Sequence, residues 1–347
     1  IIVLAKESKV DFLVIAGDFF DSNKVSEYLI QFVKEQFAIL KRAGIEVCIL
    51  PGTHDALIPN EGIYLREQFT DVSNVFVFHK KDIEKKEYPA LNAVIWGKVY
   101  DSNKSKESAL LSYDREKLSA KFNIMLAHGS LKIPGKFKDD DWPFAAREIE
   151  NSNMDYIALG HWHGAQDVSQ GKVTAWYAGS PEITSREEKG GMGQGYVLIV
   201  EISKDALITN VNVEPQQVGS KSLIEEDIDV TGMNEQVQIK EKIKEGAGPS
   251  VIKIVNIKGL LEPSLFFDPE AILEELGSLF FHLKINTMAH IAIDTIDESR
   301  YPKELIAGQY VRIMRKKIEE EKDESKKRLL EEALQIGLAE LEGKNIL

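Results

Sequence analysis

Four apolar runs in the first half of the chain end in the same way. Each run is short and almost continuously hydrophobic, which is typical of a strand buried on both faces of a parallel sheet. An aspartate or a histidine follows each run within a few positions. Because ligands bind outside the carboxyl ends of strands in open α/β sheets, we expect a buried sheet with a metal site along one edge. The runs are residues 12–16, 47–50, 124–127 and 156–159, and the polar residues that follow them include Asp18, His54, Asp55, His128, His161 and His163.

Strands and helices alternate between about residues 10 and 200, a pattern typical of a layered α/β domain. Residues 1–7 have the pattern of an amphipathic helix. Residues 195–202 and 207–213 are predicted to form a hairpin that turns at residues 203–205. The clearest early helix is predicted at residues 26–42, with an apolar stripe of Leu29, Phe32, Val33, Phe37 and Leu40. These elements predict a first domain over residues 1–215.

A smaller α/β segment is predicted at residues 222–296, beyond a candidate boundary at residues 215–222. One helix is predicted at residues 268–276, with Asp268 as its N-cap and Pro269 in its first turn. The remaining predicted elements are a helix at residues 235–245 and strands at residues 250–257, 280–285 and 290–293.

The last part of the chain, residues 300–347, has the pattern of two helices separated by the charged stretch at residues 316–328. The second helix carries an apolar stripe of Leu330, Ala333, Leu334, Gly337, Leu338 and Leu341. Two interpretations follow from this pattern. The helices pack on each other around their own core, or they form a helical hook that grips a partner helix.

Composition narrows the class of protein. The 347 residues are more than one compact domain usually holds, and the hydrophobic share of 43% is enough for buried cores. The net charge of −13 argues against wholesale coating of nucleic acid, although it does not exclude a local groove whose positive charge comes from metal ions. The lone cysteine, Cys48, is interpreted as a core residue. Without a membrane-spanning run or a signal peptide, we expect a cytoplasmic protein that does not bind membranes.

The candidate ligands combine one carboxylate with three imidazoles, a mixture that suits manganese, iron or zinc. They are Asp18, His128, His161 and His163. A carboxylate between two histidine-bearing edges can bridge two ions, and a pair of ions supports in-line attack of an activated water on a phosphoester. The leaving oxygen then needs a proton. His54 is suited to supply it, with the neighbouring Asp55 expected to orient the imidazole.

The same residues resemble the motifs of the calcineurin-like metallophosphoesterases. The matching stretches are Gly17-Asp18-x-x-Asp21, Gly52-Thr53-His54-Asp55, His128 and Gly160-His161-x-His163. The resemblance implies a four-layer αββα sandwich with a two-metal centre and His54 as the catalytic histidine. It also implies the ligand set: Asp18 bridges the ions, His163 holds the first ion, His128, His161 and Thr53 hold the second, and Asp21 supports the metal shell.

Two departures from the family pattern affect these expectations. Thr53 stands where the family usually has asparagine, and a neutral hydroxyl is a modest ligand, so the second ion is expected to bind more weakly. The Asp-x-His strand end that opens the family pattern does not occur in the sequence and belongs before Ile1. A chain that starts at Ile1 is therefore expected to bind metal poorly and to turn over little.

Three features resemble the SbcD-type DNA-repair exonucleases within that family. The first feature is the segment at residues 178–182, which follows a predicted strand, together with the glycine-rich loop after it. This loop includes the glycines at positions 190, 191, 193 and 195. The segment at 222–296 resembles their DNA-capping domain, and the terminal helices resemble the segment that binds a coiled-coil ABC-type ATPase (SbcC-like).

This closer resemblance implies a nuclease subunit that hydrolyses DNA with two divalent ions, expected to be manganese (Mn2+). It also implies a homodimer formed through the early helices, and it favours the hook interpretation of the terminal helices. The alternatives are a small-molecule phosphatase or nucleotidase of the same fold, and a catalytically weakened scaffold subunit.

Overall fold

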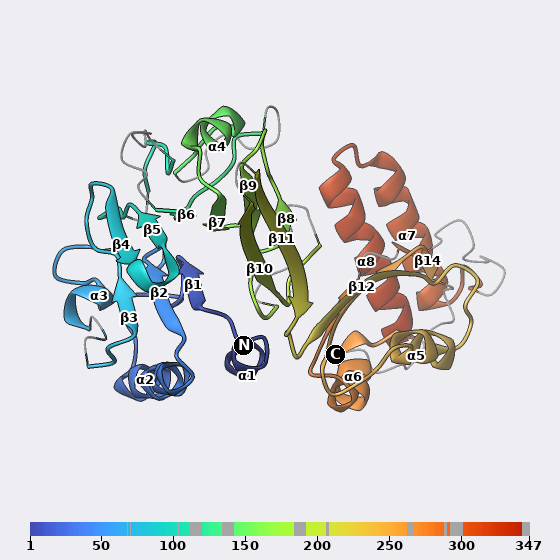
Figure 1. Ribbon diagram of the computed structural model, residues 1–347. Coiled ribbons are helices and arrows are strands. Elements are labelled where there is room, and N and C mark those ends of the chain that lie inside the picture. The colour runs from blue at the N-terminus through green and yellow to red at the C-terminus, as the bar shows by residue number, and fades with distance from the viewer. Residues whose placement is uncertain are drawn as a thin grey trace. The chain divides into compact units, whose positions relative to one another are not determined.

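The chain divides into two compact units, Ile1–Ser220 and Lys221–Leu347, in a computed structural model (Figure 1). The structure describes residues 1–67, 69, 71–102, 104–110, 120–133, 142–183, 192–205, 208–261, 267–287, 290–291 and 301–341. The glycines at positions 190 and 191, which the sequence placed in a loop, lie outside these residues.

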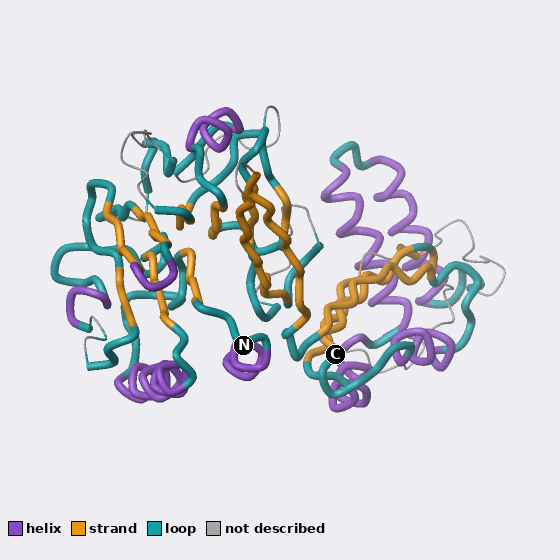
Figure 2. Tube along the Cα trace, viewed as in Figure 1, coloured by secondary structure: helices purple, strands orange, loops and turns teal. Residues whose placement is uncertain are grey.

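Besides a two-stranded hairpin, the described part of the first unit contains two larger sheets whose strands contact each other (Figure 2). The smaller sheet is parallel and has the order β1 (Phe12–Ala16), β2 (Glu46–Leu50), β3 (Val75–Val77). The larger sheet has the order β4-β5-β6-β7-β9-β8, in which the four central strands are parallel and the two edge strands antiparallel. Its strands are β4 (Glu84–Tyr88), β5 (Ala93–Gly97), β6 (Phe122–His128), β7 (Tyr156–Gly160), β8 (Gln166–Asp167) and β9 (Thr174–Tyr177).

The larger sheet is buried on both faces because alternate residues enter different cores. The core shared with β2 and α2 (Glu27–Arg42) receives Ile95, Leu126 and Ala158. The core on the other face, which includes Ile149 of α4 (Ala146–Ser152), receives Trp96, Met125 and Ile157. A helix layer thus lies outside each sheet, and the expected α/β fold of the metallophosphoesterase type is confirmed.

Helix α2 begins at Ser26, whose hydroxyl accepts a hydrogen bond from the backbone of Leu29 as an N-cap. Its buried residues follow the three-and-four spacing of one helix face and are Ile30, Val33, Phe37 and Leu40. The predicted stripe was wrong at Leu29 and Phe32, which are 41% and 48% exposed. These two side chains point away from the core, and α1 (Ile2–Glu7) contacts the same helix.

The predicted hairpin is present as β10 (Tyr196–Asp205) and β11 (Ile208–Gln217). Residues 203–205 belong to the strand rather than to the turn, because Asp205 pairs with Ile208. Asp155, just before β7, ties the hairpin to the larger sheet through an ion pair with Lys204 at 2.7 Å and a hydrogen bond from Thr209. The short elements of this unit are α3 (Ile63–Arg66) and a 3-10 turn, η1 (Pro89–Leu91).

The second unit begins with a three-stranded parallel sheet of order β12 (Ser222–Asp229), β13 (Val251–Lys258), β15 (His282–Thr287). Two helices pack on it, α5 (Gln236–Lys244) and α6 (Pro269–Leu276), and Asp268 caps the second of them as predicted. The sequence did not predict β12. The short elements are η3 (Gly277–Leu279), β14 (Leu260–Leu261) and β16 (His290–Ile291), and residues 292–293 of the predicted last strand lie outside the described chain.

The terminal helices α7 (Ile306–Glu320) and α8 (Glu324–Leu341) pack on each other. Their shared core contains Val311, Met314, Ile318, Leu334 and Leu338. The Tyr310 hydroxyl donates to the carbonyl of Ala333, and a Cβ at Gly337 would lie 2.2 Å from that hydroxyl. Only glycine therefore lets the tyrosine cross α8. The helices do form their own core, as the first interpretation of this pattern states.

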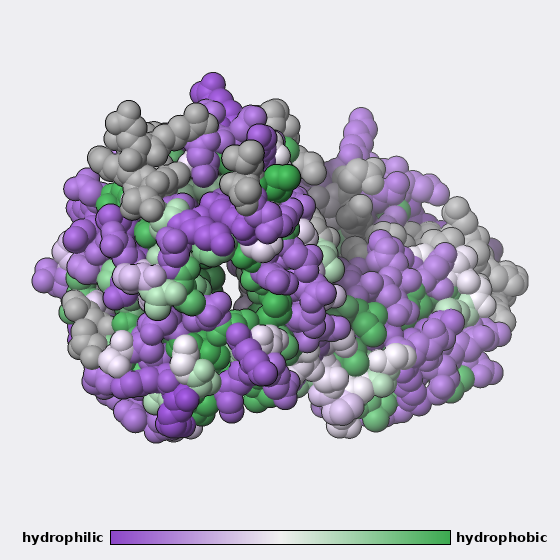
Figure 3. Space-filling model, viewed as in Figure 1, coloured by the Kyte–Doolittle hydropathy of each residue, from purple (hydrophilic) through white to green (hydrophobic). Residues whose placement is uncertain are grey.

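The face drawn in Figure 3 is mostly hydrophilic, with smaller apolar areas between the polar ones. In the described part of the chain, every helix is too short or too polar to cross a membrane.

Candidate metal centre

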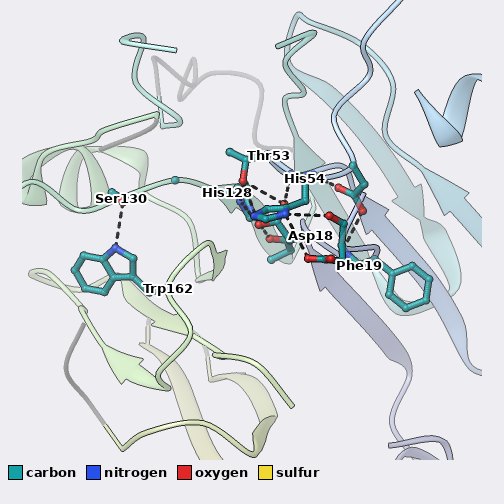
Figure 4. Close-up of polar contacts among 12 residues, drawn as sticks. Asp18, Phe19, Thr53, His54, His128, Ser130 and Trp162 are labelled. Carbon is teal, nitrogen blue, oxygen red and sulfur yellow. Dashed lines mark hydrogen bonds and ion pairs between the residues drawn. The ribbon is translucent and has the colours of Figure 1, made fainter. Parts of the chain in front are cut away.

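Side chains at the carboxyl ends of β1, β2 and β6 lie close together, among them Asp18, Thr53 and His128 (Figure 4). Asp18 follows β1, Thr53 and His54 follow β2, His128 ends β6 and His161 follows β7. A carboxylate oxygen of Asp18 and one ring nitrogen from each of His128 and His161 lie within 4.8 Å of one another. The ligands therefore come from both sheets, not from one sheet edge as the apolar runs alone suggested.

His128 has the hydrogen bonding expected of a metal ligand. Its Nδ1 lies 2.9 Å from the carbonyl of Ala16 and its Nε2 lies 3.1 Å from Oδ2 of Asp18. A proton on Nδ1 donates to that carbonyl, which fixes the ring and leaves the Nε2 lone pair for an ion. The Thr53 hydroxyl lies 3.1 Å from Oδ2 of Asp18 and 3.4 Å from this nitrogen. The donors present thus fit a divalent ion of borderline character.

Charge couples the buried members of this cluster. Burial acts to raise the pKa of Asp18, but the hydrogen bonds and charges of His128 and His54 together outweigh it and hold the pKa well below its usual range. Burial acts to lower the pKa of His128, and the Asp18 carboxylate raises it overall. The two groups therefore stabilise each other as an ion pair, which an entering cation would replace by charge–ligand contacts.

Close approach of the two sheets explains the glycine before His161. A Cβ at Gly160 would lie 1.8 Å from the carbonyl oxygen of Ala16, so any side chain there would push β7 away from β1. His161 itself has a φ of 100°, a conformation that costs of order 1–3 kcal/mol in a non-glycine residue. Such strain is typical of side chains held in place for binding or catalysis.

Comparison with known proteins agrees with this geometry. Residues 2–165 match the calcineurin-like phosphoesterase family. This part of the chain is a calcineurin-like metallophosphoesterase domain. Enzymes of this type are hydrolases of phosphate esters that depend on divalent metals, and the Asp18, His128 and His161 cluster is the candidate metal site of the domain.

Relatives of the metallophosphoesterase domain include proteins of DNA repair. The uncharacterized metallophosphoesterase YhaO of Bacillus subtilis is 28% identical over 284 residues, which cover 78% of this chain and 65% of that protein. The DNA double-strand break repair protein Mre11 of Sulfurisphaera tokodaii is 26% identical over 62% of this chain and 55% of its own length. The SbcD subunit of the SbcCD nuclease from Staphylococcus epidermidis is 21% identical over 75% and 72%. The chain thus spans between 55% and 72% of the lengths of these relatives.

His54 lies at the solvent side of the metallophosphoesterase site, with its side chain 53% exposed. Its backbone N–H donates to Oδ1 of Asp18 at 2.8 Å. Its Nδ1 lies 3.1 Å from the carbonyl of Asp21 and 3.6 Å from the carboxylate of the same residue. Asp21 is therefore the neighbour that orients the imidazole, with its backbone as well as its side chain.

Asp55 does not take the role predicted for it. We expected its carboxylate to orient His54, but the side chain is fully buried and accepts four hydrogen bonds elsewhere. The donors are the backbone N–H groups of Phe19, Phe20 and Gly52 and the hydroxyl of Tyr64. Burial raises the pKa of Asp55, although the backbone donors act against that rise.

His163 and its neighbours lie in the segment that follows β7 and His161. The backbone carbonyl of His163 accepts a hydrogen bond from Ser180, which joins the loop after β7 to residues 178–182. Trp162 stacks on Tyr177 at 4.4 Å and donates to the Ser130 hydroxyl (Figure 4). His163 lies outside the three-residue set, and its assignment as a ligand of the first ion stays a prediction, as does the ligand role of Thr53.

Replacing Asp21 with asparagine is expected to lower kcat by no more than about fivefold, because the carboxylate is exposed and screened by water. The carbonyl of Asp21 still accepts from His54 in this variant, so the imidazole stays oriented. Steady-state kinetics on a small phosphodiester would check this. A loss as large as that caused by removing the imidazole would show that the carboxylate, not the carbonyl, positions His54.

Proposed function

We propose that this chain is the nuclease subunit of a cytoplasmic DNA-repair complex and hydrolyses DNA phosphodiester bonds with two divalent ions, manganese being the expected metal. The observation that carries the proposal is the Asp18, His128 and His161 cluster with His54 beside it, on a metallophosphoesterase domain. The choice of DNA as substrate rests on the relatives, one named as a double-strand break repair protein and another as part of a nuclease.

Different residues of the chain would bind the metal ions and transfer the proton in such a reaction. Divalent ions, when bound, supply Lewis acidity toward the phosphoryl oxygens and activate water for attack. Asp18, His128, His161 and Thr53 would hold the second ion, with Asp18 also facing the first together with His163. His54 would protonate the leaving oxygen, since its imidazole is exposed to substrate while its backbone is anchored to Asp18.

A homodimer is part of the proposal and is supported by apolar side chains on α1 and α2. Tyr28 is 82% exposed, and Val3, Leu29 and Phe32 are also exposed on these two adjoining helices. Exposed apolar residues that cluster on neighbouring helices mark protein–protein contacts more often than isolated ones do. A second copy of this chain is the proposed occupant.

A coiled-coil ATPase is the second proposed partner, but the residues that would bind it differ from those first expected. Leu334 and Leu338 face the core of the helix pair, so they cannot also grip a partner. Ile306 and Ile313 of α7 are 75% and 55% exposed and lie seven residues apart, a spacing that puts both near one face of the helix. Together with Leu329 of α8, they are the proposed contact surface.

A substrate comparison tests the nuclease proposal. The protein, expressed from its complete reading frame, is incubated with manganese and labelled duplex DNA, single-stranded DNA or a nucleoside monophosphate, with Asp18→Ala as the control. The proposal expects cleavage of DNA that disappears in the Asp18→Ala protein, because that variant lacks the shared carboxylate. Hydrolysis of the monophosphate alone would overturn it and assign the site to a small-molecule phosphatase. Absence of any hydrolysis would favour the scaffold alternative.

A further inference from the structure

The Asp55 carboxylate joins two loops that carry the candidate ligands. Its Oδ2 accepts from the backbone N–H groups of Phe19 at 2.9 Å and Phe20 at 3.1 Å, both in the loop after β1. Its Oδ1 accepts from the N–H of Gly52 at 2.6 Å, in the loop after β2. A single buried side chain thus accepts hydrogen bonds from the N–H groups of the two residues that follow Asp18 and of the residue that precedes Thr53.

The loop after β1 needs such support because its conformation is strained. Asp18 has a φ of 51°, which is uncommon for a residue with a side chain and is unfavourable unless neighbouring contacts hold it. The two N–H groups that follow Asp18 converge on one carboxylate oxygen, and this arrangement fixes the turn. The direction in which the Asp18 carboxylate points therefore depends on Asp55.

Tyr64 completes the set of donors from a third segment. Its hydroxyl donates to Oδ2 of Asp55 at 2.9 Å, and its ring is almost completely buried, with the ring of Phe20 beside it. The short helix α3 that carries it is held by Asn23, whose side chain accepts from the N–H of Ile63 at 2.8 Å. Asn23 lies further along the loop after β1, so the helix that carries the tyrosine is itself tied to that loop.

We propose that Asp55 and Tyr64 are positioning residues of the metal centre: together they lock the loop bearing Asp18 to the loop bearing Thr53 and His54. This inference rests on the proposed metal-dependent function. Neither side chain belongs to the ligand cluster. Asp55 acts through its hydrogen bonds to the backbone of the two loops. Tyr64 acts by holding the carboxylate of Asp55 in place.

The two residues differ in how they can be tested. Asp55 lies within the ligand motif, and an amide there would turn an N–H group toward the backbone donors, so that variant risks unfolding. Tyr64→Phe removes one hydroxyl and keeps the buried ring. Tyr88→Phe is the matched control, since its hydroxyl also has a buried partner in the same unit, the Cys48 thiol at 3.0 Å, but lies outside the two ligand loops.

The test is a manganese titration of the parent protein, expressed from its complete reading frame, and of its Tyr64→Phe and Tyr88→Phe variants. The free ion is measured by electron paramagnetic resonance, and melting temperatures are measured without metal. We expect similar melting temperatures for the two variants. The dissociation constant should rise about tenfold in Tyr64→Phe only, because one hydrogen bond to a buried charged group is lost. At saturating manganese its kcat should return to that of the parent.

A third variant, Asn23→Ala, removes the side-chain bonds that join the loop after β1 to Ile63 of α3 and to Ala56, and it keeps all four donors of Asp55. It should weaken manganese binding in the same direction but by less. It keeps the inference testable if Tyr64→Phe does not fold. Equal manganese affinity in Tyr64→Phe, Asn23→Ala and the parent would overturn the positioning role while leaving the metal centre intact. Failure of the parent protein, expressed from its complete reading frame, to bind manganese would overturn the metal centre and the positioning role together.

Discussion

Replacing His54 with alanine is expected to lower the rate of phosphodiester hydrolysis by about 10²–10⁴-fold, the usual contribution of a general acid. Metal binding should not change, because the imidazole lies outside the ligand cluster. The bond from the backbone N–H of residue 54 to Asp18 also remains, so the loop keeps its shape. The loss should therefore appear in kcat and not in the manganese concentration needed for half-maximal activity.

The identity of the leaving group makes this test sharper. A nitrophenyl ester needs little protonation of its leaving oxygen, so His54→Ala should lose much less activity on it than on DNA. His79→Ala is a matched control, since His79 is 55% exposed and also lies beside a carboxylate, that of Glu84. An equal loss on both substrates would contradict the acid role of His54, and an unchanged rate on DNA would remove the residue from the mechanism.

Replacing both Leu334 and Leu338 with aspartate is expected to unfold the terminal helix pair. Both side chains are almost completely buried against Val311, Met314 and Ile318. A carboxylate at either position would lose its hydration without gaining a partner, and each such burial costs several kcal/mol or forces the helices apart. Circular dichroism should show loss of helix, while hydrolysis of short substrates by the first unit persists.

Substitutions on the exposed face of the same helix pair serve as the control for the buried Leu334 and Leu338 variant. Ile306→Asp combined with Ile313→Asp puts two charges into water, so this pair of substitutions should leave the melting temperature unchanged. It should instead weaken binding to the coiled-coil ATPase. If the Leu334 and Leu338 variant melted like the parent, the packing of α7 on α8 would be wrong. If it lost only partner binding, the hook interpretation would replace the core described above.

The sequence predicts elements well where one residue pattern has one physical cause. Continuous apolar runs became the strands β1, β2, β6 and β7, of which β2, β6 and β7 are mostly buried and β1 is half-buried, and the Asp268-Pro269 pair marked the start of α6. The strand β12 was missed because its sequence, Ser222–Asp229, has neither a continuous apolar run nor a strict alternation: residues 225–227 are three acidic residues in a row, and only Ile228 of this strand is fully buried. On α2, apolar spacing alone could not tell the buried Ile30 from the exposed Leu29.

The candidate site shows the same limit. Motif spacing selected Asp18, His128 and His161, and the carboxyl ends of strands from both sheets bring their ligand atoms within 4.8 Å of one another. Adjacency in sequence gave the wrong partner for His54, since the chain turns between residues 54 and 55 and sends their side chains in different directions. Tyr64 belongs to no motif, and only the folded arrangement shows that its hydroxyl meets Asp55.

The contact between His128 and the carbonyl of Ala16 spans 112 residues of chain, and that between Tyr64 and Asp55 only nine. Loops that close over such different distances form at different stages of folding, the longest ones last. The contact between Tyr64 and Asp55 can therefore form early, whereas the ligand cluster exists only after both sheets have docked. A partly folded chain lacks the complete site. An ion that binds only to the complete site therefore stabilises the folded state and disfavours unfolding.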